Sequence, residues 1–317
     1  MLLSLATACD ESRGTVRGSV RVDGSSTVFP ITEAVAEEFL REESGVRVTV
    51  GLSGTGGGFQ KFCSGEIDVS NASRPISQGE IDSCRANDIE FIELPVAYDA
   101  LSIVVNPDND WISCITLPQL KTIWEPAAQG TVTSWGDINP DWAEGGKLKL
   151  FGPGTDSGTF DYFTEHVVGE ARASRGDFTA SEDDNVLVTG ISGDKGALGY
   201  FGLAYYLENQ DKLKALQVAE TASGDCVEPT VENVESGDYP LSRPLFIYVR
   251  KDAAARPEVK AFVDFYLENA GFLASDVGYV QFPDAFYERI DSIWTTGATG
   301  SLFSGKSGTV KQVLGVP

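Results

Sequence analysis

Three short segments rich in glycine, serine and threonine carry the groups that bind an anion without using a charged side chain. Each segment precedes a run of residues with helical spacing. The first turn of a helix has unpaired N–H groups and the positive end of the helix dipole, which together attract anions. Glycine lets the backbone approach a ligand closely, and Ser or Thr adds a hydroxyl donor. The segments are Ser26-Thr27-Val28, Ser53-Gly54-Thr55 and Ser157-Gly158-Thr159.

A single segment of this kind is most simply structural, because glycine turns before helices are common. The coincidence of three is more informative, since the third is far from the other two in the sequence. A tetrahedral oxyanion enclosed between two domains needs donors from both. The sequence therefore predicts an interdomain oxyanion site, although backbone and hydroxyl donors alone do not identify the anion.

The elements that must position these segments follow from apolar patterning. Strands are predicted at 20–22, 46–52, 67–70 and 147–151, and helices at 31–39, 160–168 and 259–267. The repeated order of strand, turn and helix predicts an α/β fold with a mainly parallel sheet. In such sheets ligands gather at the carboxyl ends of the strands, and the candidate segments lie there.

Two long apolar strands are interpreted as crossings between two lobes. They cover residues 101–105 and 245–249. Lobe one is then discontinuous and lobe two is an insertion within it, and a chain of 317 residues is long enough for both. The expected division is 1–18 for a signal remnant and linker, 19–104 plus 246–317 for lobe one, and 105–245 for lobe two.

The amino terminus is typical of an export signal. A short apolar run leads to small residues and then Cys9, as in the processing site of a lipoprotein, where Cys9 would carry the lipid. The run has no basic start, and Ala6 stands where such sites usually have Leu. The alternative is an ordinary signal fragment with an incidental cysteine. No other apolar stretch is long enough to span a membrane.

The remaining cysteines are even in number, which in an exported protein predicts two disulfides with three possible pairings. Pairing within the first lobe favours Cys63 with Cys84 and leaves Cys114 for Cys226. Zinc is not favoured, because the sequence has no CxxC pair and His166 is its only histidine. We expect neither a metal nor another cofactor.

The net charge of −23 argues against a nucleic-acid partner, which would require a basic surface. An anion site made of neutral donors tolerates this acidity, because recognition depends on local dipoles. The acidity is most simply interpreted as keeping an exported protein in solution.

Longer stretches around the candidate segments resemble the phosphate-binding proteins of Pst-type ABC transporters, most closely the SphX branch. The resemblance implies a type II periplasmic binding protein, with two α/β lobes, two hinge strands and the ligand in the cleft between the lobes. It further implies a monomer, periplasmic or at the cell surface, that binds inorganic phosphate with high affinity and delivers it to a membrane permease. The stretches are residues 23–30, 53–58, 71–75 and 152–159.

The same resemblance implies roles for individual residues. Ser26 would donate its hydroxyl and amide, and Thr27 and Val28 would add backbone amides or the Thr27 hydroxyl. One hydroxyl would come from Ser53 or Thr55, between which the likeness does not decide. Ser157, Gly158 and Thr159 would supply amides and hydroxyls from lobe two.

Two positions depart from the pattern of the family. Ser73 stands where many relatives have an Asp that accepts the proton of the phosphate, and Pro153 stands where many have an Arg. Our hypothesis is that Arg74 supplies the missing guanidinium, whose planar fork suits bidentate contact with phosphate. Asp156 is the candidate proton acceptor or partner of Arg74, with a helix N-cap as the equal alternative.

Other functions remain as alternatives. A serine hydrolase built on Ser157 needs a base, and His166 lies within the helix predicted after that serine. A nucleotide-binding P-loop is not favoured, because no GKS or GKT follows residues 53–58. The serious alternative is a binding protein for sulfate, arsenate or molybdate, and a phosphate sensor is another.

Overall fold

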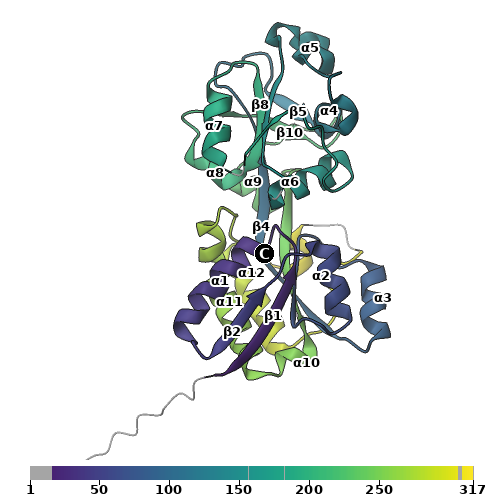
Figure 1. The fold of residues 1–317 in the computed structure, drawn as a ribbon, viewed down its shortest axis with the longest axis vertical. Coiled ribbons are helices and arrows are strands. Elements are labelled where there is room, and N and C mark those ends of the chain that lie inside the picture. The colour runs from purple at the N-terminus through teal and green to yellow at the C-terminus, as the bar shows by residue number, and fades with distance from the viewer. Residues whose placement is uncertain (1–15, 156, 182, 306–308, 317) are drawn as a thin grey trace, which may run out of the picture.

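The structure is a computed structural model that describes residues 16–155, 157–181, 183–305 and 309–316. Its elements form two groups, one above the other in Figure 1, joined where β4 (Phe91–Val105) and β11 (Ser242–Arg250) run between them. This confirms the α/β fold with two lobes and two connecting strands. The candidate residues Cys9 and Asp156 lie outside the described residues.

One sheet continues through both lobes. Its strands lie in the order β2-β1-β3-β11-β4-β8-β6-β7, and β9 pairs with β4; β5 and β10 pair separately. In lobe one the strands run parallel, except that β11 is antiparallel to its neighbours. In lobe two, β8, β6 and β7 run parallel to one another. The other strand bounds are β1 (Gly18–Gly24), β2 (Val46–Val50), β3 (Val69–Ala72), β5 (Cys114–Thr116), β6 (Lys149–Gly152), β7 (Thr179–Ala180), β8 (Ala197–Gly202), β9 (Lys214–Ala215) and β10 (Gln217–Ala219).

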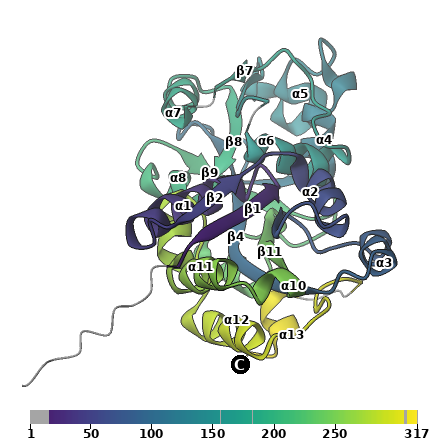
Figure 2. The same ribbon diagram turned by 60° about the horizontal axis from the view of Figure 1, so that its bottom comes forward.

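Helices cover the sheet in each lobe (Figure 2). In lobe one, α1 packs on α11 through edge-to-face and tilted contacts of Phe39 with Phe262 and Phe265. The helices are α1 (Phe29–Glu42), α2 (Gly54–Cys63), α3 (Gln78–Ala86), α4 (Leu117–Trp124), α5 (Trp135–Ile138), α6 (Gly158–Phe163), α7 (Asp184–Ser192), α8 (Leu203–Glu208), α9 (Val231–Ser236), α10 (Lys251–Ala254), α11 (Pro257–Asp276), α12 (Asp284–Thr296) and α13 (Val310–Leu314). Three described helical turns have other geometry: η1 (Pro126–Ala128) and η2 (Pro140–Gly145) are 3-10 helical, and η3 (Thr164–Val168) is π-helical.

The connecting strands show where the chain changes lobe. β4 pairs with β11 from Phe91 to Ala100 and then with β8 from Leu101 onward. β4 therefore enters the sheet of lobe two a few residues before the boundary expected at 104/105. β11 pairs with β3 only from Phe246 to Val249. The division into 19–104 plus 246–317 and 105–245 stays a prediction.

Two disulfides join the cysteines as the sequence predicts. Cys63 at the end of α2 is bonded to Cys84 in α3, within lobe one. Cys114 in β5 is bonded to Cys226, within lobe two. The first bridge ties α2, which begins at one candidate anion segment, to the neighbouring helix.

Among the described helices, none has the length and apolarity that a membrane crossing requires. The tryptophans of lobe two are packing residues: Trp124 and Trp135 are buried, and Trp124 meets Phe163, Phe178 and Tyr200 edge to face. These contacts support the segment that carries α6 and η3.

Candidate functional site

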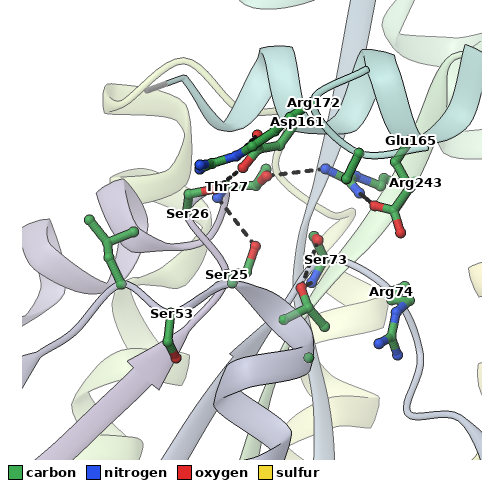
Figure 3. A pocket seen from close by; sticks show the side chains of 15 residues that line it. Ser25, Ser26, Thr27, Ser53, Ser73, Arg74, Asp161, Glu165, Arg172 and Arg243 are labelled. Atoms are coloured by element: carbon green, nitrogen blue, oxygen red, sulfur yellow. Dashed lines mark hydrogen bonds and ion pairs between the residues drawn. The ribbon is translucent and has the colours of Figure 1, made fainter. Parts of the chain in front are cut away.

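A cleft of about 770 Å³ lies between the two lobes. Three loops of lobe one, the α6–η3 segment of lobe two with the loop after it, and the first residues of β11 line it, so donors converge from both sides and from a connecting strand (Figure 3). The lining residues are Ser25, Ser26, Thr27, Leu52, Ser53, Gly54, Thr55, Gly56, Ser73, Arg74, Asp161, Glu165, Ala171, Arg172 and Arg243.

The start of α1 delivers the first candidate segment to this cleft. The hydroxyl of Ser25 accepts a hydrogen bond from the Thr27 amide, and Pro30 occupies the first turn, where no intrahelical donor is needed. Val28 is the N-cap residue and its side chain is fully buried, so any ligand contact from it must come from its backbone. Ser26 and Thr27 present their side chains to the cleft.

Thr27 makes one contact between the two lobes. Its hydroxyl donates to the Gly158 carbonyl of lobe two at 3.2 Å and accepts from Arg243 Nη2 at 3.1 Å. The hydroxyl of Tyr279 donates to the Thr27 carbonyl at 2.6 Å. These bonds hold the loop before α1 between the start of β11 and the start of α6.

Ser26 makes a second contact between the lobes. Its hydroxyl donates to Asp161 Oδ2 at 3.0 Å, and Arg172 pairs with the other oxygen of Asp161 at 3.0 Å. The Asp161 carboxylate thus faces the cleft, as does that of Glu165, among hydroxyl and guanidinium donors. Such a group repels a fully deprotonated anion, but it accepts a hydrogen bond from a ligand that carries a proton.

The start of α2 supplies the third group of hydroxyls. Thr55 Oγ1 lies 3.0 Å from Ser73 Oγ and accepts from the Ser73 amide. The Ser53 hydroxyl also lines the cleft, but it donates to Asp23 at 2.7 Å. Of the two hydroxyls between which the sequence could not decide, Thr55 is the one that lies beside Ser73.

Arg74 lines the cleft, yet its guanidinium is held by an acidic residue that the sequence analysis did not consider. Both terminal nitrogens donate to the two oxygens of Glu80 at 2.9 Å, and Nη1 also reaches the Pro75 carbonyl. Hydrogen bonding to Glu80 raises the pKa of Arg74. Burial alone would raise the pKa of Glu80, but hydrogen bonds from Arg74 and Ser77 lower it overall.

Arg243 is a second guanidinium in the cleft and comes from β11. It pairs with Asp99 through Nε and Nη2, both at 3.3 Å, and its charged group lies 3.7 Å above the ring of Tyr162. Glu165 is 3.8 Å from Nη1. Burial raises the pKa of Asp99, although the charge of Arg243 acts in the opposite direction.

The lobe-two segment Ser157-Gly158-Thr159 lies at the start of α6, with Ser157 as the N-cap that accepts from the Thr159 amide at 3.2 Å. Gly158 packs so closely that a Cβ built on it would lie 2.5 Å from Thr27 Cα. The structure brings this segment to Thr27, but the side chains that reach the cleft from lobe two belong to Asp161, Glu165 and Arg172.

Sequence reasoning missed four charged residues of the cleft: Asp161, Glu165, Arg172 and Arg243. Asp161 and Glu165 stand four and eight residues after Ser157, so helical spacing alone could have placed them on the face of the predicted helix that carries this serine. Arg243 precedes the apolar strand 245–249, but nothing local shows that this end of the strand faces the cleft.

Groups that would support other chemistry are not assembled within the described residues. His166 Nε2 bonds to the Pro240 carbonyl at 3.0 Å, and its ring packs by Tyr162 rather than by a serine. Among those residues, no group of three or more His, Cys, Asp or Glu side chains is arranged to hold a metal ion.

Comparison with known proteins gives a consistent result. Residues 10–270 match the model of the PBP superfamily domain. The protein SphX of Synechococcus elongatus is 49% identical over 302 residues, which cover 94% of this chain and 88% of that protein. The phosphate-binding protein PstS of Staphylococcus saprophyticus is 40% identical over 286 residues, which cover 89% of this chain and 86% of that protein.

A solved structure supports the same relationship. The crystal structure of a possible phosphate binding protein from Planctomyces limnophilus superposes with a TM-score of 0.84 at 46% sequence identity. The match covers 89% of this chain and 99% of the other. The likeness therefore extends over both lobes.

Proposed function

The chain belongs to the PBP superfamily and, within it, to the SphX and PstS phosphate-binding proteins, and we propose that it binds inorganic phosphate in the cleft between its lobes. It does so outside the cytoplasmic membrane and delivers the phosphate to an ABC permease, without catalysing a reaction. The observation that carries this proposal is the convergence of Ser26, Thr27, Thr55 and Ser73 with guanidinium groups in one cleft.

The donors suit a tetrahedral oxyanion because they come from several directions. The α1 and α2 helices of lobe one both begin at the cleft, so the positive ends of their dipoles point into it. Across the cleft lies the start of α6, with Gly158 against Thr27. Binding then proceeds by closure: anion oxygens join the donors of the two lobes, and the connecting strands bend.

Selectivity for phosphate is assigned to Asp161. At neutral pH phosphate carries at least one proton and sulfate carries none, so only phosphate can donate a hydrogen bond to a carboxylate in its site. Asp161 faces the cleft, is anchored by Arg172 and contacts Ser26 across it. In this proposal Asp161 takes the role that the family resemblance gives to the Asp found in many relatives at the position of Ser73. Arsenate is also protonated, and this device does not distinguish it from phosphate.

Calorimetric titration of the purified protein with phosphate, sulfate and arsenate tests the proposal. We expect tight binding of phosphate, binding of arsenate and weak binding of sulfate. Asp161→Asn should lower the affinity for phosphate and raise that for sulfate, whereas Asp82→Asn, which removes an exposed carboxylate paired with Arg85, should change neither. Tighter binding of sulfate than of phosphate by the unmutated protein would instead establish the sulfate alternative.

Absence of catalysis and the state of the amino terminus are tested separately. Incubation with a generic phosphate ester should release no phosphate beyond the rate without protein, and sustained turnover would contradict a pure binding function. For Cys9, the expected result is a lipid-modified cysteine in mass spectra of protein isolated from membranes. A monomeric mass in light scattering would support the expected monomer.

A further inference from the structure

Arg243 lies where the two connecting strands and the two lobes meet. Its Cα is the register partner of Asp99, so each connecting strand contributes one member of the ion pair. Both side chains are largely buried, with 13% and 4% of their surface exposed. Interactions of a charge in such surroundings are screened by water much less than those of a surface charge.

The hydrogen bonds of Arg243 leave one nitrogen uncommitted. Nε and Nη2 each donate a hydrogen bond to Asp99, and Nη2 also donates one to the Thr27 hydroxyl. Among the described residues Nη1 has no hydrogen bond; its nearest acidic neighbour is Glu165 at 3.8 Å. A guanidinium has five N–H donors in a fixed fork, so the two on Nη1 remain available to a ligand.

Space for a ligand borders the Arg243 side chain. Arg243 lines the cleft and also a second cavity of about 300 Å³, which shares Ser73, Arg74 and Glu165 with it. Figure 3 shows the Arg243 side chain pointing toward Thr27, to whose hydroxyl Nη2 donates. The fork is therefore held in place by Asp99 and Thr27, while Nη1, which lies 3.8 Å from Glu165, keeps its two N–H donors in a side chain that lines both cavities.

The other two guanidinium groups are less suited to this task. Arg74 uses both terminal nitrogens on Glu80, and Figure 3 shows its side chain directed away from Thr27. Arg172 is 64% exposed and pairs with Asp161. An exposed guanidinium is screened by water and salt, and one in a bidentate pair must break that pair before it can bind a ligand.

We propose that Arg243 is the cation that binds the anion in this cleft, through its Nη1 donors, and that Asp99 is the residue that positions it. The proposal rests on the proposed function and replaces Arg74 in the role that the sequence suggested. Because the guanidinium touches Thr27 of lobe one and the ring of Tyr162 of lobe two, an anion held by Arg243 also stabilises the closed arrangement of the lobes.

Titration with phosphate by calorimetry tests the role of Arg243. Loss of one charge-assisted hydrogen bond costs about 1.5–3 kcal/mol, so Arg243→Gln should weaken phosphate binding by about 10- to 150-fold. Arg250→Gln is the matched control, because Arg250 lies on the same strand and bonds to the Gly65 carbonyl, away from the cleft. This variant loses stability from the same strand but should bind phosphate normally.

Arg243→Lys provides a second test that does not depend on the folding of the glutamine variant. Lysine keeps the charge near Asp99 but lacks the planar fork, so it cannot donate hydrogen bonds to Asp99, Thr27 and a ligand at the same time. We expect at least about tenfold weaker phosphate binding in the lysine variant, with the thermal midpoint of the ligand-free protein little changed.

A double-mutant cycle tests the positioning role of Asp99. Asp99→Asn should weaken phosphate binding in the unmutated background and have no further effect in the Arg243→Gln background, because Asp99 acts only through Arg243. A merely structural role for Asp99 would weaken binding by the same factor in both backgrounds.

The outcomes separate this inference from the proposed function. If the unmutated protein does not bind phosphate, the proposed function fails before any variant is compared. If that protein binds phosphate and Arg243→Gln or Arg243→Lys binds it equally well, the assignment of Arg243 is wrong. Loss of binding in Arg74→Gln alone would return the role to Arg74.

Discussion

Gly158→Ala tests whether phosphate affinity depends on the contact between the two lobes. A Cβ at this position would lie 2.5 Å from Thr27 Cα and 2.7 Å from Thr27 N, where ordinary contacts begin at 3.4 Å. The atoms that it meets are mostly backbone, and they cannot rotate away as the end of a side chain can. The lobes must therefore separate by close to an ångström at this point.

The size of the effect follows from the hydrogen bonds that such a separation breaks. The bonds from Ser26 to Asp161 and from Thr27 to Gly158 are 3.0 and 3.2 Å long, so both would leave hydrogen-bonding range. At about 0.5–1.5 kcal/mol each, the closed arrangement loses about 1–3 kcal/mol. When the competent state is populated less, the apparent affinity falls in proportion, here by about 5- to 150-fold.

Calorimetry with phosphate measures the affinity, and solution scattering with and without phosphate reports closure through the radius of gyration. The matched control is Gly79→Ala, because a Cβ at Gly79 in α3 would meet no atom within 4 Å. We expect weaker binding and reduced closure only in the Gly158 variant. Unchanged affinity and closure in that variant would refute the inference that this contact belongs to the closed, binding form.

Three further predictions concern the cleft and its supports. Asp161→Asn should weaken phosphate binding by about tenfold and narrow its preference over sulfate, as competitive calorimetry would show; an unchanged preference would contradict its role as proton acceptor. Replacing Cys114 and Cys226 by Ala should lower the free energy of unfolding in urea by about 2–5 kcal/mol, because the bridge closes a loop with a sequence separation of 112. The pKa of Glu80 is lowered in the folded protein, where Glu80 pairs with Arg74. The pair therefore stabilises the fold fully at pH values above the ordinary pKa of 4.5, and this stabilisation is lost as the pH falls through the lowered pKa. The difference in unfolding free energy between wild type and Glu80→Gln should therefore be constant above pH 4.5 and shrink below it; a constant difference down to strong acid would contradict the ion pair.

Local patterns were sufficient for much of the fold. Alternating apolar residues mark the strands β1 and β2, and glycine-rich turns mark where helices begin. The structure places the start of α1 directly after the first candidate segment and the starts of α2 and α6 at the glycines of the second and third. The helix predicted at 160–168 begins earlier, at Gly158, and continues after Phe163 as the π-helical turn η3. The pairing of Cys63 with Cys84 could be predicted because both precede the expected change of lobe.

The charges of the site were harder to predict from the sequence. The position of Arg74 directly after Ser73 predicts a ligand contact, but Glu80, six residues away, pairs with its guanidinium from within a capping box that begins at Ser77. Arg243 is 216 residues from the Thr27 hydroxyl that it contacts. Neither pairing has a sequence signature, because each depends on which strand ends and helix faces the fold brings together.

The sequence by itself determined that three helix starts expose N–H and hydroxyl donors, since a glycine- and serine-rich turn before a helix presents these groups by local geometry alone, and it predicted that they bind an anion. Only the tertiary structure decided which charged side chains join them. The antiparallel pairing of β4 with β11 places Asp99 beside Arg243, and the packing of α6 brings Asp161 to Ser26. Charges act through space, so the electrostatics of the cleft depend on distances that the chain acquires only when both lobes have folded.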